Sequence, residues 1–463
     1  MTKFFLVLIA ILASIAVTAQ DITGQWNSVL KVQGTQFRLV FNVSKTDDGY
    51  SATMDSPDQN AKGIPVTKTT FENSKITFDI ANAGIEYNGE LKDDEIIGVF
   101  KQNGHGFPMN LSRKVIEKQI LKRPQEPQKP YPYYSEEVTF QNHEAHINLA
   151  GTLTLPKKGS NFPAVILISG SGPQNRNEEL LGHKPFLVIA DYLTKNGIAV
   201  LRYDDRGVGQ SKGNFKTATS ADFATDVESA VAYLKTRKEI NKIGLIGHSE
   251  GGLIAPMVAN KSTDIAFIVL LAAPGIQGDQ ILLLQQKLIG KASGISENDL
   301  QKNELISRKT YAIVNKSNSL EQLNTDLSNY LKTVLKDNPK NEKPTAMSDD
   351  EFLKLQVSQI ATPWMHYFIT YNPAPALEKI KCPVLALNGE KDLQVPANEN
   401  IEAIKKALAK AGNTNVTTKI FPNLNHLFQE SKTGVPTEYA TIEQTFSPLV
   451  LDEITKWINT QAK

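Results

Sequence analysis

The feature that most constrains this chain is a Gly-x-Ser-x-Gly motif at residues 247–251, Gly-His-Ser-Glu-Gly. It stands between a short apolar run at 243–246 and a helix-like stretch at 253–259. A strand, this motif and then a helix form a nucleophile elbow, a tight turn that exposes a serine hydroxyl at the edge of a sheet. Both glycines have a steric role, because residues two places from the serine are pressed against backbone. The motif therefore predicts that Ser249 is a nucleophile.

The chain has 463 residues, of which 40% are apolar and 21% are charged. A chain of this length exceeds one compact core, so two or three domains are expected. The formal net charge is +1, and no run of Lys or Arg suggests a nucleic-acid partner or a membrane-surface patch. The composition is that of an ordinary globular protein.

Residues 1–19 have the pattern of a secretory signal peptide. Lys3 supplies a positive start, residues 4–17 form an apolar region, and Val17-Thr18-Ala19 is a small-residue cleavage site. The apolar region is shorter than the roughly 20 residues that a membrane-spanning helix needs, and no later stretch is long enough either. The sequence therefore predicts a secreted or periplasmic protein with no membrane span.

The segment before the motif divides into two parts. Residues 20–113 alternate apolar and polar positions between turn signals such as Asn88-Gly89. About eight such strands without a helical stretch predict a small antiparallel β-barrel or half-barrel. Residues 114–135 are charged and rich in proline, which favours extended backbone, so we interpret them as a linker.

The rest of the chain follows a different rhythm. Residues 136–275 and 379–463 alternate strand-like and helix-like segments, and the unbroken apolar run at 164–168 is typical of a strand covered on both faces. This order predicts an α/β fold with a mostly parallel, doubly wound sheet. Residues 276–378 show helical spacing instead and are far too long for a plain connection. Because they follow a central strand at the edge where ligands bind, we predict a helical cap over the site.

An attacking serine needs a base to take its proton and an acid to orient that base. For a serine on such an elbow, the chain order is serine, acid, histidine. His426 is the only histidine that follows both Ser249 and a plausible strand-end acid. We predict Asp392, in the loop 388–396, as that acid, with Glu390 of the same loop as the alternative.

Two other features of the sequence are not expected to take part in catalysis. His248 adjoins the serine, but an elbow sends adjacent side chains in different directions, so we do not expect it to be the base. A second Gly-x-Ser-x-Gly match at 209–213 has no strand leading into it and no helix after it. We therefore interpret Ser211 as structural, and we expect Arg206 to hold this loop by hydrogen bonds.

Stabilising an oxyanion requires two backbone donors. One is predicted to be the N–H of Glu250, directly after the nucleophile. The other should come from the loop 169–173, Ser-Gly-Ser-Gly-Pro, which follows the first long parallel strand. We predict the N–H of Ser171, with Gly172 as the alternative.

Trp364 and His366 belong to an aromatic-rich stretch of the predicted cap and are predicted to bind substrate. Packing of these aromatic residues against the core is an equally good interpretation, and for His366 a packed helix position is the simpler one. The other histidines show no paired-ligand spacing, so we predict no metal and no cofactor. The single cysteine, Cys382, is interpreted as a buried apolar residue at the start of a strand.

Together these motifs resemble the secreted bacterial α/β-hydrolases of the esterase and serine aminopeptidase-like group. The resemblance spans roughly residues 120–463. The motifs that carry it are 169–173, Tyr203-Asp204-Asp205-Arg206-Gly207-Val208-Gly209, 247–251, Gly389-Glu390-Lys391-Asp392 and Asn425-His426. It implies the α/β-hydrolase fold with a helical cap, a β-rich domain before it, and a carboxylic ester as the commonest substrate.

The expected activity is hydrolysis of a small-molecule carboxylic ester, with a short to medium acyl group, through an acyl-enzyme on Ser249. An aminopeptidase or dipeptidyl-peptidase with the same triad is the first alternative. It would need an acid to hold the substrate ammonium, and Glu178 and Glu179 are the candidates. A non-catalytic glycan- or lipid-binding protein is a further alternative, which a complete triad argues against. The sequence does not fix the oligomeric state.

Overall fold

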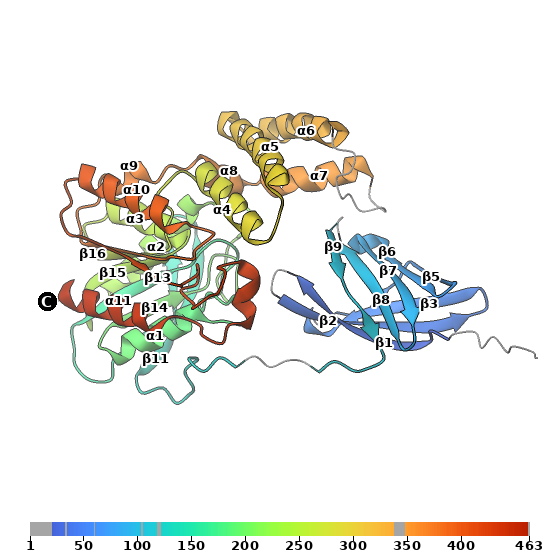
Figure 1. Cartoon of the computed structure of the whole chain (residues 1–463). Coiled ribbons are helices and arrows are strands. Elements are labelled where there is room, and N and C mark those ends of the chain that lie inside the picture. Colours follow the sequence, from blue (N-terminus) through green and yellow to red (C-terminus); the bar gives the residue numbers. More distant parts are fainter. Residues whose placement is uncertain are drawn as a thin grey trace, which may run out of the picture. The chain divides into compact units, whose positions relative to one another are not determined.

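The computed structural model describes residues 21–32, 35–59, 61–102, 105–117, 122–337 and 348–461 (Figure 1). The predicted leader, residues 1–19, lies outside these ranges. The chain forms two compact units that divide near residue 118. Each unit has its own sheet. Among the described residues, none of the helices combines the length and the apolarity needed to cross a bilayer.

The first unit is an antiparallel half-barrel. Its strands are β1 (Gly24–Val32), β2 (Thr35–Thr46), β3 (Gly49–Ser56), β4 (Ala61–Pro65), β5 (Lys68–Glu72), β6 (Lys75–Ile80), β7 (Ile85–Lys92), β8 (Glu95–Gln102), β9 (His105–Pro108) and β10 (Leu111–Ser112). The order across the sheet is β4-β3-β2-β1-β10-β8-β7-β6-β5, with β9 paired to β8. Alternate side chains fill an aromatic core in which the rings of Phe41 and Phe78 stack at 4.6 Å. The sequence predicted about eight strands; β9 and β10 are too short to show a periodicity.

The second unit is built on an eight-stranded sheet of order β11-β12-β14-β13-β15-β16-β17-β18. Its strands are β11 (Tyr134–Asn142), β12 (Ile147–Leu155), β13 (Phe162–Ile168), β14 (Ala199–Tyr203), β15 (Ile240–His248), β16 (Ile265–Leu271), β17 (Val384–Gly389) and β18 (Val416–Phe421). β11, β12 and β14 pair antiparallel, and every other pairing is parallel. The predicted α/β class with a mostly parallel sheet is confirmed.

Helices cover both faces of this sheet (Figure 1). They are α1 (Pro185–Lys195), α2 (Ser220–Lys235), α3 (Gly251–Lys261), α10 (Ala397–Lys410) and α11 (Pro448–Gln461). Apolar residues of α1 and α11 share one buried cluster with the sheet, and those of α2, α3 and α10 share another. The sheet is therefore buried on both sides, which explains the continuous apolar runs of its central strands. Cys382 lies just before β17, half-buried against the second of these clusters.

The described residues between β16 and β17 form six further helices. They are α4 (Gly278–Ala292), α5 (Glu297–Lys316), α6 (Leu320–Asp337), α7 (Asp349–Ile360), α8 (Pro363–Thr370) and α9 (Ala374–Leu377). Val314, Leu323, Leu327, Leu353 and Ile369 form a buried cluster of their own within this segment. These helices form the helical cap of the fold. Phe368 of α8 packs in the buried core of the α/β unit and so attaches the cap to it.

Part of the proline-rich segment packs on the second unit. The Arg123 guanidinium donates hydrogen bonds of 2.8 Å to the carbonyls of Ala440 and Ile442. Glu126 forms an ion pair with Lys184 at 2.9 Å. Residues 122–133 therefore run along the α/β unit, held by polar contacts that the proline content alone did not indicate.

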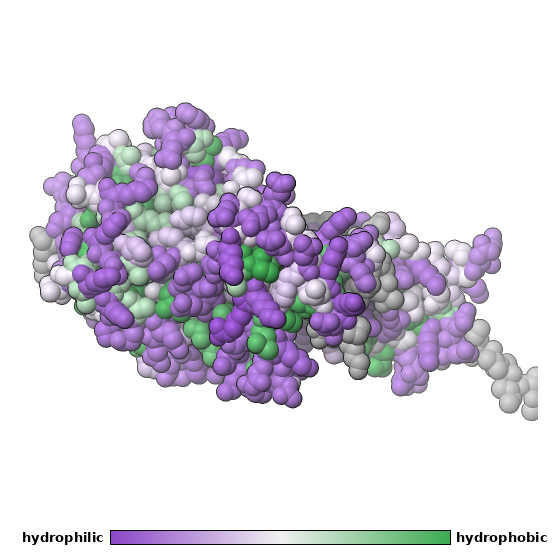
Figure 2. Space-filling view, turned by 90° about the horizontal axis from the view of Figure 1, so that it is seen from above, coloured by the Kyte–Doolittle hydropathy of each residue, from purple (hydrophilic) through white to green (hydrophobic). Residues whose placement is uncertain are grey.

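The face of the molecule shown in Figure 2 is mostly hydrophilic, with hydrophobic residues in small separate areas. The large apolar side chains that remain exposed in the described ranges come from separate elements; they are Ile97, Val99, Val115, Tyr134, Leu180, Ile295, Leu305, Ile420 and Leu449. Scattered exposure of this kind is ordinary for a globular protein.

Candidate active site

The Gly-x-Ser-x-Gly motif forms the turn between β15 and α3. Ser249 has a φ of 52°, in the left-handed region, and its N–H donates to the Leu271 carbonyl at 2.9 Å. A Cβ atom on Gly247 would lie 2.1 Å from the Gly251 carbonyl oxygen, and a Cβ on Gly251 would lie 2.1 Å from that of Ile168. Backbone contacts this close leave glycine as the only residue that fits at either position. The turn thus has the strained geometry of a nucleophile elbow.

Asp392 and His426 lie in the loops after β17 and β18 and are both buried. His426 Nδ1 is 2.8 Å from Asp392 Oδ2. The other carboxylate oxygen, Oδ1, accepts the backbone N–H groups of Gln394 and Val395 at 2.9 and 2.8 Å. These bonds fix the carboxylate, so Oδ2 receives the Nδ1–H and Nε2 is the imidazole nitrogen left to take a proton.

The alternative acid is engaged elsewhere. Glu390 Oε2 accepts the N–H of Asn423 at 3.0 Å, at the turn that follows β18. It makes no bond to an imidazole in the part of the chain that the structure describes. The geometry therefore favours Asp392 over Glu390 as the partner of His426.

The three predicted triad positions follow β15, β17 and β18 directly, so they lie at the carboxyl edge of one sheet. The rings of His248 and His426 are 5.0 Å apart between centroids, which places the His426 loop beside the elbow. Among the described residues, no hydrogen bond joins the Ser249 hydroxyl to the imidazole. Such bonds are often long without substrate and shorten in the reacting complex.

Hydrogen bonds hold the predicted oxyanion loop, residues 169–173, beside the elbow. Asp205 accepts the Ser169 hydroxyl at 2.8 Å and the Gln174 N–H at 3.0 Å; burial raises the pKa of this carboxyl well above its ordinary value. Within the described ranges the backbone N–H groups of Ser171 and Glu250, the two predicted donors, have no acceptor. Both are therefore free to bind an incoming oxyanion.

The Glu250 side chain is buried and points away from solvent. Its Oε1 accepts the Ser220 hydroxyl at 2.6 Å and the indole Nε1–H of Trp364 at 2.8 Å, and burial raises its pKa. The structure thus brings Trp364 of α8 to the elbow. His366 follows Trp364 by two residues in α8, and its Nε2 lies 3.0 Å from the Ser317 carbonyl inside the cap. Its role in substrate binding stays a prediction.

Ser211 has the structural role expected of it. Its hydroxyl donates to the Asp204 carbonyl at 2.6 Å and accepts the Ala150 N–H at 2.9 Å. Arg206 pairs with Asp226 of α2 at 2.7 Å. The second Gly-x-Ser-x-Gly match is therefore a buried loop and not a second elbow.

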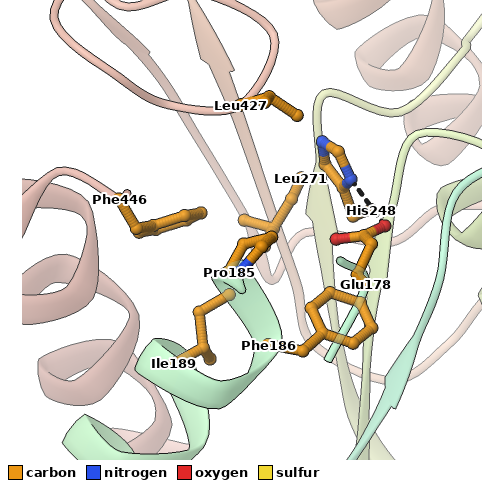
Figure 3. Close-up of a pocket in the computed structure, with 8 residues that line it drawn as sticks. All are labelled: Glu178, Pro185, Phe186, Ile189, His248, Leu271, Leu427 and Phe446. Carbon is orange, nitrogen blue, oxygen red and sulfur yellow. Dashed lines mark hydrogen bonds and ion pairs between the residues drawn. The ribbon is translucent and has the colours of Figure 1, made fainter. Parts of the chain in front are cut away.

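One polar pair beneath the elbow has no counterpart in the sequence reasoning. Glu178 Oε1 lies 2.9 Å from His248 Nδ1, and His248 Nε2 lies 3.0 Å from the His426 carbonyl. Figure 3 shows this carboxylate facing the imidazole among apolar side chains. The sequence suggests Glu178 only as an acid that could face the pocket and hold a substrate ammonium, a role that its burial and its partners do not suit. No local pattern announces a contact between residues 70 positions apart.

Comparison with known proteins agrees with this architecture. The profile of the serine aminopeptidase S33 family of hydrolases matches residues 184–432. The chain belongs to this family. The matched range covers more than half of the chain and contains all three predicted triad positions, and the predicted resemblance to the α/β-hydrolase group is confirmed.

Two curated proteins and one solved structure illustrate the range of relatives of this S33-family chain. Esterase EstD of Thermotoga maritima is 27% identical over 336 residues, which cover 71% of this chain and 69% of EstD. An acyl transferase of Shewanella woodyi is 33% identical over 140 residues, 29% of this chain and 43% of the relative. The Pyrococcus furiosus esterase Pf2001 aligns with a TM-score of 0.44 and 16% identity over 75% of this chain and 100% of its own. That last likeness is too distant to bear on the activity of this chain.

The S33-family chain is thus a hydrolase of the α/β-hydrolase fold, with a half-barrel before it. In the described ranges, no cluster of three His, Cys, Asp or Glu side chains is placed to hold a metal ion.

Proposed function

We propose that this chain is a serine esterase that hydrolyses small carboxylic esters with short to medium acyl groups. The observation that carries the proposal is the buried Asp392–His426 pair, 2.8 Å apart, at the sheet edge where the elbow holds Ser249. A fixed carboxylate, an oriented imidazole and a serine on a strained turn are the parts of a Ser-His-Asp triad.

The proposed reaction has two steps. The Ser249 oxygen attacks the ester carbonyl carbon while His426 Nε2 takes the hydroxyl proton, and the N–H groups of Ser171 and Glu250 bind the oxyanion. Collapse of the tetrahedral intermediate breaks the bond to the alkoxy oxygen, which leaves as alcohol with the proton from His426. A water molecule, deprotonated by His426, then attacks the acyl-enzyme, and the acid departs as Ser249 regains its proton. Asp392 stabilises the imidazolium in both steps.

Two observations support an ester over a peptide substrate. The relative EstD, which aligns over 71% of this chain, is an esterase. Glu178, one of the two acids considered for a substrate ammonium, is 4% exposed and already accepts two hydrogen bonds. The family name favours an aminopeptidase as the second candidate, for which the exposed Glu179 remains as the ammonium partner.

A substrate panel separates the two candidates. We expect turnover of nitrophenyl acetate and butyrate, declining toward longer acyl chains, and none of aminoacyl nitroanilides. Turnover confined to the nitroanilides would replace the esterase proposal with the peptidase.

A labelling experiment tests the nucleophile. A fluorophosphonate probe should label the wild type and Ser211→Ala but not Ser249→Ala, because Ser211 is held in backbone hydrogen bonds away from the elbow. A folded wild type that is not labelled would favour the alternative of a non-catalytic binding protein.

We also propose that the protein is exported after removal of residues 1–19. Cell fractionation followed by amino-terminal sequencing should find a chain that begins at Gln20. Recovery of the intact leader on cytoplasmic protein would contradict the proposal.

A further inference from the structure

Glu178 is an acidic residue at a buried position, where burying a carboxylate costs free energy. Only 4% of it is exposed, and its backbone has a φ of 50°, which is uncommon outside glycine. Its Oε1 accepts the N–H of Gly170 at 2.7 Å and lies 2.9 Å from His248 Nδ1. Gly170 immediately precedes Ser171, the proposed oxyanion donor, so this carboxylate fixes the backbone of the oxyanion loop.

The contacts of His248 favour one protonation state. Its Nε2 faces the carbonyl oxygen of His426 at 3.0 Å, and a carbonyl can only accept. Its Nδ1 faces Glu178 Oε1, which already accepts the Gly170 N–H. With Glu178 ionised, both ring nitrogens donate and His248 is the doubly protonated imidazolium.

The surroundings agree with a matched pair of charges. The pair is lined by the apolar side chains of Pro185, Phe186, Leu271 and Leu427 (Figure 3). The pocket that they form leaves no room for a water molecule. A single charge in such a place would be strongly destabilising, whereas a hydrogen-bonded pair is tolerated. Burial by itself would lower the pKa of His248, but the Glu178 charge and the bond to the His426 carbonyl raise it above its ordinary value.

The pair connects three segments that the proposed mechanism must hold together. Glu178 reaches the oxyanion loop, His248 directly precedes the nucleophile, and the His426 carbonyl belongs to the loop that carries the base. We propose that Glu178 and His248 form a buried carboxylate–imidazolium pair that positions the oxyanion loop and the base histidine around Ser249. They are positioning residues, since neither touches the reacting atoms. The kinetic part of this inference rests on the proposed function.

Kinetics per active site test the positioning. In Glu178→Gln the amide oxygen still accepts the Gly170 N–H, whereas Glu178→Ala leaves that N–H and the His248 Nδ1–H without a partner. Because misplacement by about 1 Å can cost about 10²-fold in rate, we expect kcat per fluorophosphonate-labelled site to fall about that much in Glu178→Ala. Glu178→Gln should fall less, and KM should change little in either. The control is Glu126→Gln, which removes an acid that pairs with Lys184 outside the site.

Nitrogen-15 NMR of histidine-labelled protein tests the ion pair without requiring turnover. The wild type should show one imidazolium with two slowly exchanging ring N–H protons that persists above pH 7. Its signals should disappear in His248→Gln, and Glu178→Gln should remove one of the two protons. A neutral His248 ring in the wild type, or an unchanged kcat per labelled site in Glu178→Ala, would overturn the inference. If no ester is turned over, the proposed function fails while the NMR result still decides the ion pair.

Discussion

The indole Nε1–H of Trp364 donates a hydrogen bond of 2.8 Å to Oε1 of Glu250, the residue that follows the nucleophile. The bond crosses from α8 of the cap to the turn between β15 and α3. Because the Glu250 N–H is a proposed oxyanion donor, one residue carries both the cap contact and the donor. The position of the cap and the shape of the elbow are therefore coupled through a buried carboxyl group.

Replacement of Trp364 by Phe should loosen this coupling. The ring still packs on Phe368, with which it stacks at 5.2 Å, but Glu250 loses one of its two donors. Leaving a buried acceptor less satisfied costs about 1–3 kcal/mol, so the free energy of unfolding should fall and KM for an ester should rise. Denaturant titration and steady-state kinetics measure the two effects. Trp457→Phe is the control. It removes an indole hydrogen bond of 3.3 Å to Thr417 on the opposite side of the sheet and should leave KM unchanged. Equal KM values in the Trp364 and Trp457 variants would contradict the coupling.

Asp392→Asn should reduce kcat far more than it affects KM. An amide can present its NH₂ group to His426 Nδ1 and so hold the imidazole in the wrong tautomer. In serine enzymes with this triad such a change costs on the order of 10⁴ in kcat. Glu390→Gln is the matched control, because the amide oxygen can still accept the Asn423 N–H. A larger loss in Glu390→Gln than in Asp392→Asn would reassign the acid.

The strand-turn-helix geometry of the elbow could be predicted from its motif, and the motif together with chain order is what led to the predicted triad. Gly247 is required by a backbone contact within the turn itself, with Gly251, whereas Gly251 is required by a contact with the Ile168 carbonyl of β13. The expected acid and histidine follow from chain order at successive strand ends. The alternation of strands and helices in the α/β unit could also be predicted from the sequence. The polar contacts that connect these positions could not be predicted. Glu178 contacts His248, 70 residues away in the sequence, and Trp364 contacts Glu250, 114 residues away. A polar contact between distant segments leaves no periodicity in a single sequence.

The strength of the steric rule at the elbow can be measured with Gly251→Ala. The new Cβ would lie 2.1 Å from the Ile168 carbonyl oxygen, so either β13 or α3 must shift. We expect a loss of several kcal/mol in the free energy of unfolding, as for other substitutions that overfill a rigid site, together with loss of fluorophosphonate labelling. Gly106→Ala is the control, since its Cβ would make only ordinary contacts, with the side chains of Val99 at 3.5 Å and Lys101 at 3.9 Å. Normal stability and labelling in Gly251→Ala would show that the turn is looser than its contacts indicate.

A further buried histidine, outside the site, links the loop before α1 to the segment before α11. His183 is fully buried, with Nδ1 3.1 Å from the Thr445 hydroxyl and Nε2 2.9 Å from the Tyr439 carbonyl. The Tyr439 carbonyl can accept an Nε2–H and the Thr445 hydroxyl can donate to Nδ1, so these two partners suit the neutral ring. The side-chain Nε2 of Gln429 also lies 3.0 Å from His183 Nε2. Burial lowers the pKa of His183 to about 4.

Acidification should therefore destabilise the fold through His183. The unfolded chain binds a proton at this residue near its ordinary pKa of about 6.5, whereas the folded chain does so only near about 4. Between these values the unfolded state holds more protons, so the free energy of unfolding falls as the pH falls, by about 3 kcal/mol in total. In His183→Gln the other titrating groups remain, so the difference between the two stability curves isolates this residue. Denaturant titrations from pH 7 to pH 4 should show a shallower decline for the variant. Parallel curves would mean that His183 takes up its proton over the same pH range in the folded protein as in the unfolded chain.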